Sequence, residues 1–402
     1  MSIKLYSNIF WKLYFNRQIR RQQMRSVDGC TLVTNGIIAN EHLSGYGVFD
    51  DKLNFVGTSI CHRGGGKNIV PTKINKSGIE YIDQDVVFLG GILGHFGDFL
   101  VNNLTRVYAL LQDQYNDWHV VFVNDKNINP IPEWLYVFLE LVNIPRERVI
   151  ILNKTTQFRN VLVPTQGWDF PIWSSDECNN VFDVMADNVG KCDTKCYDKI
   201  YLSRDALNLR RTYGEKYVSE IFNKNGFTII YPETLSLKQQ IALVRNCRVL
   251  VGCAGTALHL ALFMKPGGCV IQIKRNSQIK DNSSMQYLIN KTKKLNSVFI
   301  SGAIEKRSSK HCTTVPQIIG LNKYLRKFMD ENGFNYDKQM AIIDELTWNE
   351  YNTELINYNK SHDGMFVDLL KRKFIKITSC FVIGRTRRAC FRTKMKSWLH
   401  VN

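Results

Sequence analysis

Patterns typical of buried strands and of amphipathic helices alternate along this 402-residue chain in two separate series, and this restricts its possible folds more than any other feature. The first series predicts strands and intervening helices at 86–89, 100–111, 119–123, 131–142, 149–152 and 161–163. The second series predicts strands at 199–203, 227–230, 248–251 and 269–273 and helices at 215–225, 236–246 and 256–264. Strands that alternate with helices favour parallel sheets covered on both faces, so we expect two α/β units facing each other.

A polar stretch at 187–198 separates the two series and is predicted to be the linker. The expected organisation is a basic amphipathic arm, an α/β unit, a second α/β unit and a helical tail with a basic amphipathic end, over residues 1–26, 27–190, 191–315 and 316–402. Ser236 followed by Gln239 predicts a capping box at the start of one helix of the second unit.

The net charge of +17 is concentrated at the two ends of the sequence. Residues 1–26 contain six Lys and Arg and residues 369–402 contain ten, with no acid in either, whereas 27–368 are almost neutral. Apolar residues at helical spacing accompany both basic segments: Tyr6, Ile9, Phe10, Leu13 and Tyr14; Leu370, Phe374, Ile377 and Phe381. Each Lys or Arg near an anionic leaflet contributes about 1 kcal/mol, so both segments are predicted to bind a membrane surface. The alternative is that the apolar stripes pack on the protein's own core.

Other features narrow the class of protein. The sequence contains no run of eighteen apolar residues, and we expect neither a membrane-spanning helix nor a cleavable signal peptide. The scattered cysteines are typical of a protein in a reducing compartment. We therefore expect a cytoplasmic protein that lies at the inner face of the membrane. Cys192 and Cys196 have no histidine nearby, and no metal site is predicted. The run Gly64–Lys67 lacks the spacing of a nucleotide-binding P-loop and is predicted to be a surface loop.

Polar residues follow three predicted strands of the second unit, where parallel sheets bind their ligands. Arg204 comes after the first, Glu233 after the second and Gly255-Thr256 after the third. A guanidinium and a helix N-terminus both suit a phosphate, and a carboxylate can accept bonds from ribose hydroxyls. The G-x-G-x-x-G pattern is missing after the first strand, which argues against a dinucleotide cofactor.

Each of these residues also has a simpler interpretation. Arg204 fits a surface residue or a partner of Asp205, Glu233 fits a turn, and Gly252 with Gly255 fits close packing of strand and helix.

In the first unit, His95 and Asp98 follow a predicted strand and share one face of a helical turn. Such a pair suits the removal of a proton from an acceptor hydroxyl. The alternative is that Asp98 caps the helix while His95 bonds to the backbone.

Several short motifs occur in order: Gly94-His95-Phe96-Gly97-Asp98-Phe99-Leu100, Tyr201-Leu202-Ser203-Arg204, Pro232-Glu233-Thr234-Leu235-Ser236 and Val251-Gly252-x-x-Gly255-Thr256-Ala257-Leu258-His259. Over about 85–275 the chain thereby resembles the family-61 glycosyltransferases, whose bacterial members are linked to capsular polysaccharide synthesis. It departs from many relatives at Asp98, where they carry a second histidine, and at Cys253-Ala254-Gly255, where they carry Pro-His-Gly.

The resemblance implies two Rossmann-like domains facing a cleft, a GT-B-like architecture, and an inverting, metal-independent transfer from a nucleotide sugar that is often UDP-linked. It maps His95 and Asp98 to the acceptor side. From the position of the motif we expect Asp98 to be the base and His95 to be its partner or an acceptor ligand. The donor side is expected to comprise Ser203, Arg204, Glu233, Gly252, Gly255, Thr256, Ala257 and His259, with Arg210 and Arg211 as further phosphate ligands or solvated residues.

The expected acceptor is a glycan or lipid-linked glycan of the cell surface. Two other functions remain open at this stage. The basic charge also permits nucleic-acid binding. However, the sequence contains no zinc finger or RNA-recognition pattern, so we do not expect a nucleic-acid partner. A non-catalytic scaffold of an envelope glycan assembly would also keep the fold.

Overall fold

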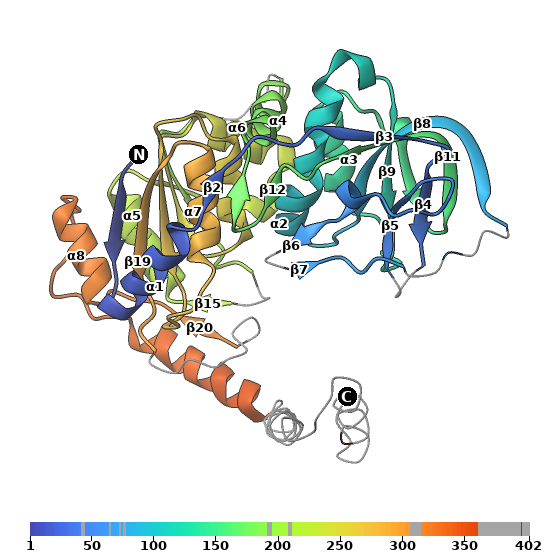
Figure 1. Ribbon diagram of the computed structural model, residues 1–402. Coiled ribbons are helices and arrows are strands. Elements are labelled where there is room, and N and C mark those ends of the chain that lie inside the picture. Colours follow the sequence, from blue (N-terminus) through green and yellow to red (C-terminus); the bar gives the residue numbers. More distant parts are fainter. Residues whose placement is uncertain are drawn as a thin grey trace.

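The computed structural model of the protein describes residues 1–41, 45–63, 66–71, 74, 78–190, 195–207, 211–305, 315–360 and 395. Arg210, Cys192 and almost all of the basic tail at 369–402 lie outside the described residues. The chain forms two lobes side by side, each around one large sheet (Figure 1). We call the lobe around the seven-stranded sheet the first lobe and the lobe around the six-stranded sheet the second lobe.

The sheet of the first lobe is mixed rather than wholly parallel. Its central strands run parallel in the order β10 (Val149–Leu152), β9 (His119–Val123), β8 (Glu80–Gly91) and β11 (Thr156–Pro164). Three strands from the turn-rich start of the chain add antiparallel edges: β3 (Cys30–Thr34), β4 (Ile37–Asn40) and β5 (Tyr46–Phe49). The predicted parallel core is therefore present, and short hairpin-like strands extend it.

Helices of the first lobe pack on this sheet and continue toward the second lobe (Figure 1). They are α2 (Phe96–Asp98), the π-helical η3 (Phe99–Asn103), η4 (Leu104–Leu111) and α3 (Glu133–Glu140). The next helix, α4 (Asp176–Asp187), lies beside α6 (Leu237–Asn246) of the second lobe (Figure 1). Shorter elements are η2 (Gly57–Ser59), η5 (Asp113–Tyr115), η6 (Arg146–Arg148), β6 (His62–Arg63), β7 (Gly66–Lys67), β12 (Trp168–Asp169) and β13 (Trp173–Ser174).

The sheet of the second lobe is wholly parallel. Its order is β1 (Ile3–Tyr6), β19 (Asn296–Ser301), β18 (Cys269–Lys274), β17 (Val249–Cys253), β14 (Lys199–Leu202) and β16 (Thr228–Ile230). Alternate residues of one strand enter different cores, as Ile200 and Tyr201 show. Helical elements cover both faces: α5 (Glu215–Lys224), η7 (Pro232–Thr234), α6 (Leu237–Asn246), η8 (Thr256–Phe263), α7 (Ser283–Thr292) and α8 (Lys323–Glu331).

The predicted capping box at Ser236 and Gln239 is confirmed, with each side chain bonded to the other residue's backbone N–H. In the tail, residues 345–360 are helical, and β15 (Thr212–Tyr213) pairs with β20 (Gln317–Ile318). No helix in the described part of the chain has both the length and the apolar character needed to cross a bilayer.

The N-terminal segment differs from the predicted arm, because it is built into the second lobe. β1 pairs with β19, some 290 residues away, and Tyr6 is a buried strand residue rather than part of a helical stripe. The helix α1 (Ile9–Ile19) buries Trp11 and Phe15 against α7 and β19, and β2 (Gln23–Met24) pairs with β13. One face of this helix therefore packs on the protein's own core, which is the alternative to membrane binding described above.

The lobes share an apolar core at their junction. Phe263 of η8 stacks on Phe138 of α3, with ring centroids 6.1 Å apart, and contacts Phe182 of α4 edge-on at 5.6 Å. This packing fixes η8, and with it the residues at its N-terminus, against the first lobe.

Candidate functional site

A cavity of about 490 Å³ lies where the two lobes meet. The first lobe contributes His95, Gly97, Asp98, Val101 and Phe170 to its lining. The second lobe contributes mostly polar and basic residues: Arg204, Ala254, Gly255, Thr256, His259, Gln272, Lys274, Arg275, Asn276, Gln278, Lys280, Asp281, Asn282, Ser283, Met285, Gln286 and Gln317. The cavity is large enough to hold a small-molecule ligand.

The topology of the second sheet explains this location. From β14 the chain crosses to β16 on one side and then returns to form β17 on the other side, so the direction of winding reverses between β14 and β17. Open parallel sheets bind ligands beyond the carboxyl ends of the strands at such a reversal. Arg204 follows β14 and Gly255 follows β17, and both line the cavity.

On the first-lobe side, His95 and Asp98 stand together at the start of a helix. His95 Nδ1 lies 3.7 Å from Asp98 Oδ2, and both side chains are accessible from the cavity. His95 occupies the N-cap position of α2, and its side chain makes no capping hydrogen bond. Asp98 lies at the N-cap position of the next element, η3, and its side chain makes no capping hydrogen bond there. The helix then continues through the π-helical η3, an irregularity that is frequent at functional sites.

The lobes approach each other closely beside this pair. A Cβ placed on Gly97 would lie 2.4 Å from Thr256 Cγ2 and 3.2 Å from His259 Cδ2. Only a residue without a side chain fits between these atoms, so Gly97 allows the helix of the first lobe to reach the N-terminus of η8.

His259 is thereby placed next to the acceptor-side pair rather than only on the donor side. Gln286 donates through Nε2 to Leu258 O and to Asn290 Oδ1, so its Oε1 accepts a bond from His259 Nδ1 at 3.0 Å. Burial lowers the pKa of His259 to about 4, and Asp98 acts against this effect. The ring is therefore neutral at physiological pH, with its proton on Nδ1 and the lone pair of Nε2 available.

On the second-lobe side, the position of Arg204 is fixed from its backbone. Its N–H donates to Glu215 Oε1 at 3.2 Å, and Ser203 Oγ donates to Asp205 Oδ1 at 2.6 Å. A Cβ on Gly255 would lie 3.0 Å from Arg204 Nη1, so the bare backbone of Gly255 leaves room for the guanidinium at the start of η8.

Glu215 is a fully buried carboxyl between two arginines of the cavity wall. Burial raises its pKa to about 8, although the charges of Arg204 and Arg275 act in the opposite direction. Arg275 Nη1 also donates to Thr212 Oγ1 at 3.3 Å. With Glu215 protonated, the two guanidinium groups present net positive charge to the cavity, as an anionic ligand requires.

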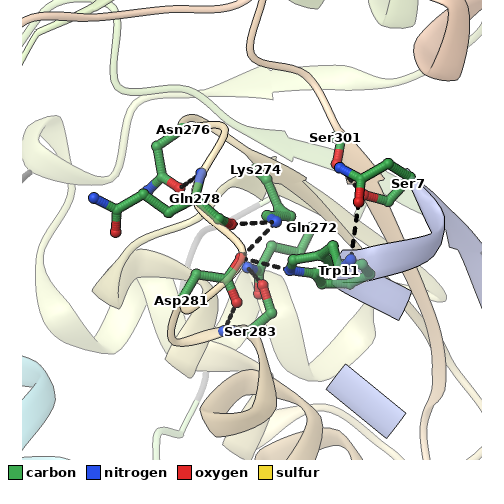
Figure 2. Close-up of polar contacts among 10 residues, drawn as sticks. Ser7, Trp11, Gln272, Lys274, Asn276, Gln278, Asp281, Ser283 and Ser301 are labelled. Carbon is green, nitrogen blue, oxygen red and sulfur yellow. Dashed lines mark hydrogen bonds and ion pairs between the residues drawn. The ribbon is translucent and has the colours of Figure 1, made fainter. Parts of the chain in front are cut away.

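The loop after β18 forms the remaining wall and is held by a buried ion pair (Figure 2). Lys274 Nζ lies 2.7 Å from Asp281 Oδ2, and both side chains are at most 10% exposed. Trp11 of α1 donates from Nε1 to the same carboxylate oxygen at 2.9 Å, and its ring lies 4.1 Å from Lys274 Nζ. Asp281 Oδ1 accepts from the backbone of Ser283. The N-terminal helix therefore stabilises a loop that carries Arg275 and Lys280 into the cavity.

The structure brings together only part of the predicted site. His95, Asp98, Arg204, Gly255, Thr256 and His259 line the cavity. Ser203, Gly252 and Ala257 do not line it, and Glu233 is exposed on η7, also outside the lining. Arg211 lies outside the lining, where it pairs with Glu350 at 3.3 Å and stacks on Tyr213.

Lys274, Arg275 and Lys280 also line the cavity, although their sequence pattern was not recognised as part of the site. The sequence pattern that predicted Arg204 also applies to two of these residues. Lys274 is the last residue of β18 and Arg275 follows it directly, just as Arg204 comes shortly after the end of β14. In the described residues, no three His, Cys, Asp or Glu side chains gather as a metal site would require.

Comparison with known protein families bears on this cavity. Residues 96–271 match the family Glycosyltransferase 61. The matched range contains Asp98, Arg204, Thr256 and His259, and so includes residues from both sides of the cavity. The match supports a glycosyltransferase role. No curated protein matches the chain.

Proposed function

We propose that the protein is an inverting glycosyltransferase of GT-B-like architecture. It transfers a sugar from a nucleotide donor, UDP-linked in our proposal, to a glycan acceptor in capsular or other cell-surface polysaccharide synthesis. One observation carries this proposal: acid–base residues of the first lobe and cationic residues of the second lobe face the same cavity at the reversal point of a parallel sheet.

The donor diphosphate is assigned to the second-lobe wall. Arg204, Arg275 and Lys280 supply positive charge, and the start of η8 at Gly255 and Thr256 lines the same cavity. In this proposal these cations stabilise the leaving diphosphate without a metal ion. Glu233 is given no role here, because it lies outside the cavity lining.

The acceptor hydroxyl is assigned to the first-lobe wall. Asp98 removes its proton as the oxygen attacks the anomeric carbon from the side opposite the diphosphate. The bond from that carbon to the phosphate oxygen breaks, and the nucleoside diphosphate leaves with the electron pair. His95, 3.7 Å from Asp98, orients the carboxylate.

His259 is a second candidate for the base, because its neutral ring has a free lone pair beside Asp98. Two matched variants distinguish them. Asp98→Asn and His259→Asn each remove one base, and nucleotide release from UDP-, GDP- and CMP-sugars is measured with UDP binding as control. We expect Asp98→Asn to slow release by about 10²- to 10⁴-fold while it still binds UDP.

Near-normal turnover in Asp98→Asn together with loss in His259→Asn would assign the base to His259. If the wild-type protein consumes no nucleotide sugar, the scaffold function replaces the enzymatic one. A gel shift of DNA or RNA at physiological salt would favour the nucleic-acid alternative.

A further inference from the structure

Helix α1 has two different apolar faces, of which only one is used inside the protein. Trp11 and Phe15 are 1% exposed and pack against Tyr287 and Phe299. On the outward face, Ile9, Phe10 and Leu13 are 60%, 68% and 62% exposed. Three large apolar side chains on one turn of a helix form a patch that solvent alone does not explain.

The charged residues of α1 itself are all positive. Residues three or four apart share a helix face, so Arg17 continues the row of Ile9 and Leu13, and Arg20 follows at the C-cap. All three Arg residues at 17, 20 and 21 are exposed, and residues 1–26 contain no acid.

We propose that this outward face of α1 docks on an anionic lipid bilayer. Phe10, Ile9 and Leu13 insert among the lipid chains at the interface, while Arg17, Arg20 and Arg21 bind the headgroups. The combination of a short apolar row with basic residues and no acid matches the anionic headgroup layer above an apolar interior. An acidic protein surface would pair with the arginines but would leave the three apolar side chains without a partner.

The position of α1 connects this docking to the cavity. Trp11, on the opposite face of the same helix, donates to Asp281, and Asp281 lines the cavity. A helix with its side chains is about 10–12 Å across, so the bilayer surface would lie about one helix diameter from the cavity wall. Resting on the proposed function, this placement favours an acceptor that is a glycan carried on a membrane lipid.

The test is co-sedimentation of the full-length protein with vesicles of phosphatidylcholine alone or with one-third phosphatidylglycerol. We expect binding only to the anionic vesicles, decreasing with salt, and weakened about tenfold or more in the double variant Phe10→Ser, Leu13→Ser. Leu32→Ser with Leu346→Ser is the matched control, because these side chains are 55% and 75% exposed elsewhere. Circular dichroism verifies that all variants are folded.

The basic segment at 369–402 also favours anionic vesicles, so a local readout is needed. Phe10→Trp is expected to show blue-shifted emission, quenched by brominated lipid, on anionic vesicles, and Leu346→Trp is not. Vesicle binding without any change at position 10, or equal binding by the Phe10, Leu13 double variant, would overturn the proposal. So would an absence of vesicle binding together with a change of oligomeric state in that variant, which would identify the face as a contact between two copies. None of these experiments measures sugar transfer, so they test membrane docking independently of the proposed reaction. If the protein transferred no sugar, the inference of a lipid-linked acceptor would fall, but the inference of membrane docking would stand.

Discussion

Gly97 of the first lobe and Thr256 of the second lobe lie so close that a Cβ on Gly97 would be 2.4 Å from Thr256 Cγ2. The contact sits between Asp98 on one side and the N-terminus of η8 on the other, so it sets the distance between the proposed acceptor and donor walls.

Gly97→Ala is therefore expected to push the two walls apart. A displacement of about 1 Å in a reacting pair can cost about 10²-fold in rate, and we predict a loss of this order in kcat/KM with little loss of folding. Gly94→Ala is the control, because its Cβ would lie 3.2 Å from the flexible end of Ile128. Equal activity of both variants would show that the lobe contact does not set the reaction geometry.

The raised pKa of Glu215 predicts how nucleotide binding depends on pH. Below about pH 8 the carboxyl is protonated and does not neutralise the charges of Arg204 and Arg275, which then attract a diphosphate. Above that pH the carboxylate neutralises part of this charge, so UDP affinity should fall as pH rises through about 8. Glu215→Gln should flatten this dependence, which titration of UDP binding at several pH values would measure. An identical pH profile in the variant would contradict this role.

The free energy of unfolding should also depend on pH through Glu215. Glu215 ionises at about 8 in the folded protein but near 4.5 when exposed, so the folded state binds more protons between these values. The contribution of Glu215 to the free energy of unfolding is fully present below about pH 4.5 and is lost as pH rises through about 8. Urea unfolding of wild type and Glu215→Gln at both ends of this range would detect it, and a constant difference between them would not fit.

The buried pair of Lys274 and Asp281 predicts a large effect from a small change. Asp281→Asn leaves the Lys274 ammonium buried without a counter-charge, which typically costs about 3–5 kcal/mol in unfolding free energy. Glu133→Gln breaks the exposed pair with Arg146 and should cost less than about 1 kcal/mol. Urea unfolding compares the two. Similar values would mean that the loop after β18 is not held by this pair.

Local sequence patterns predicted the second lobe well. Short, mainly apolar runs of residues predicted the strands at 199–202 and 269–274, and the capping box at Ser236 involves two residues only three positions apart. Such signals depend on neighbours in sequence. By contrast, β1 pairs with β19 across the whole chain, and β3 to β5 join their sheet antiparallel, pairings that short-range periodicity does not specify.

The site was predictable where a side chain follows a strand end, as for Arg204, but not where tertiary contacts choose its direction. Arg211 turns to Glu350 and Glu233 turns to solvent, although both stand near predicted strand ends. His259 was assigned to the donor side by its motif, and only the approach of Gly97 shows that it also faces Asp98.

The central claim is that a nucleoside diphosphate binds in the cavity against Arg204. Calorimetric titration of UDP, GDP and CMP into wild type, Arg204→Ala and Arg211→Ala tests it most directly. We predict that UDP binds the wild type and that Arg204→Ala weakens it about 10- to 100-fold, since a hydrogen bond to a charged group contributes about 1.5–3 kcal/mol. Arg211→Ala, whose guanidinium pairs with Glu350, should bind like the wild type. If no nucleotide binds, or if both variants bind as tightly as the wild type, the account is contradicted.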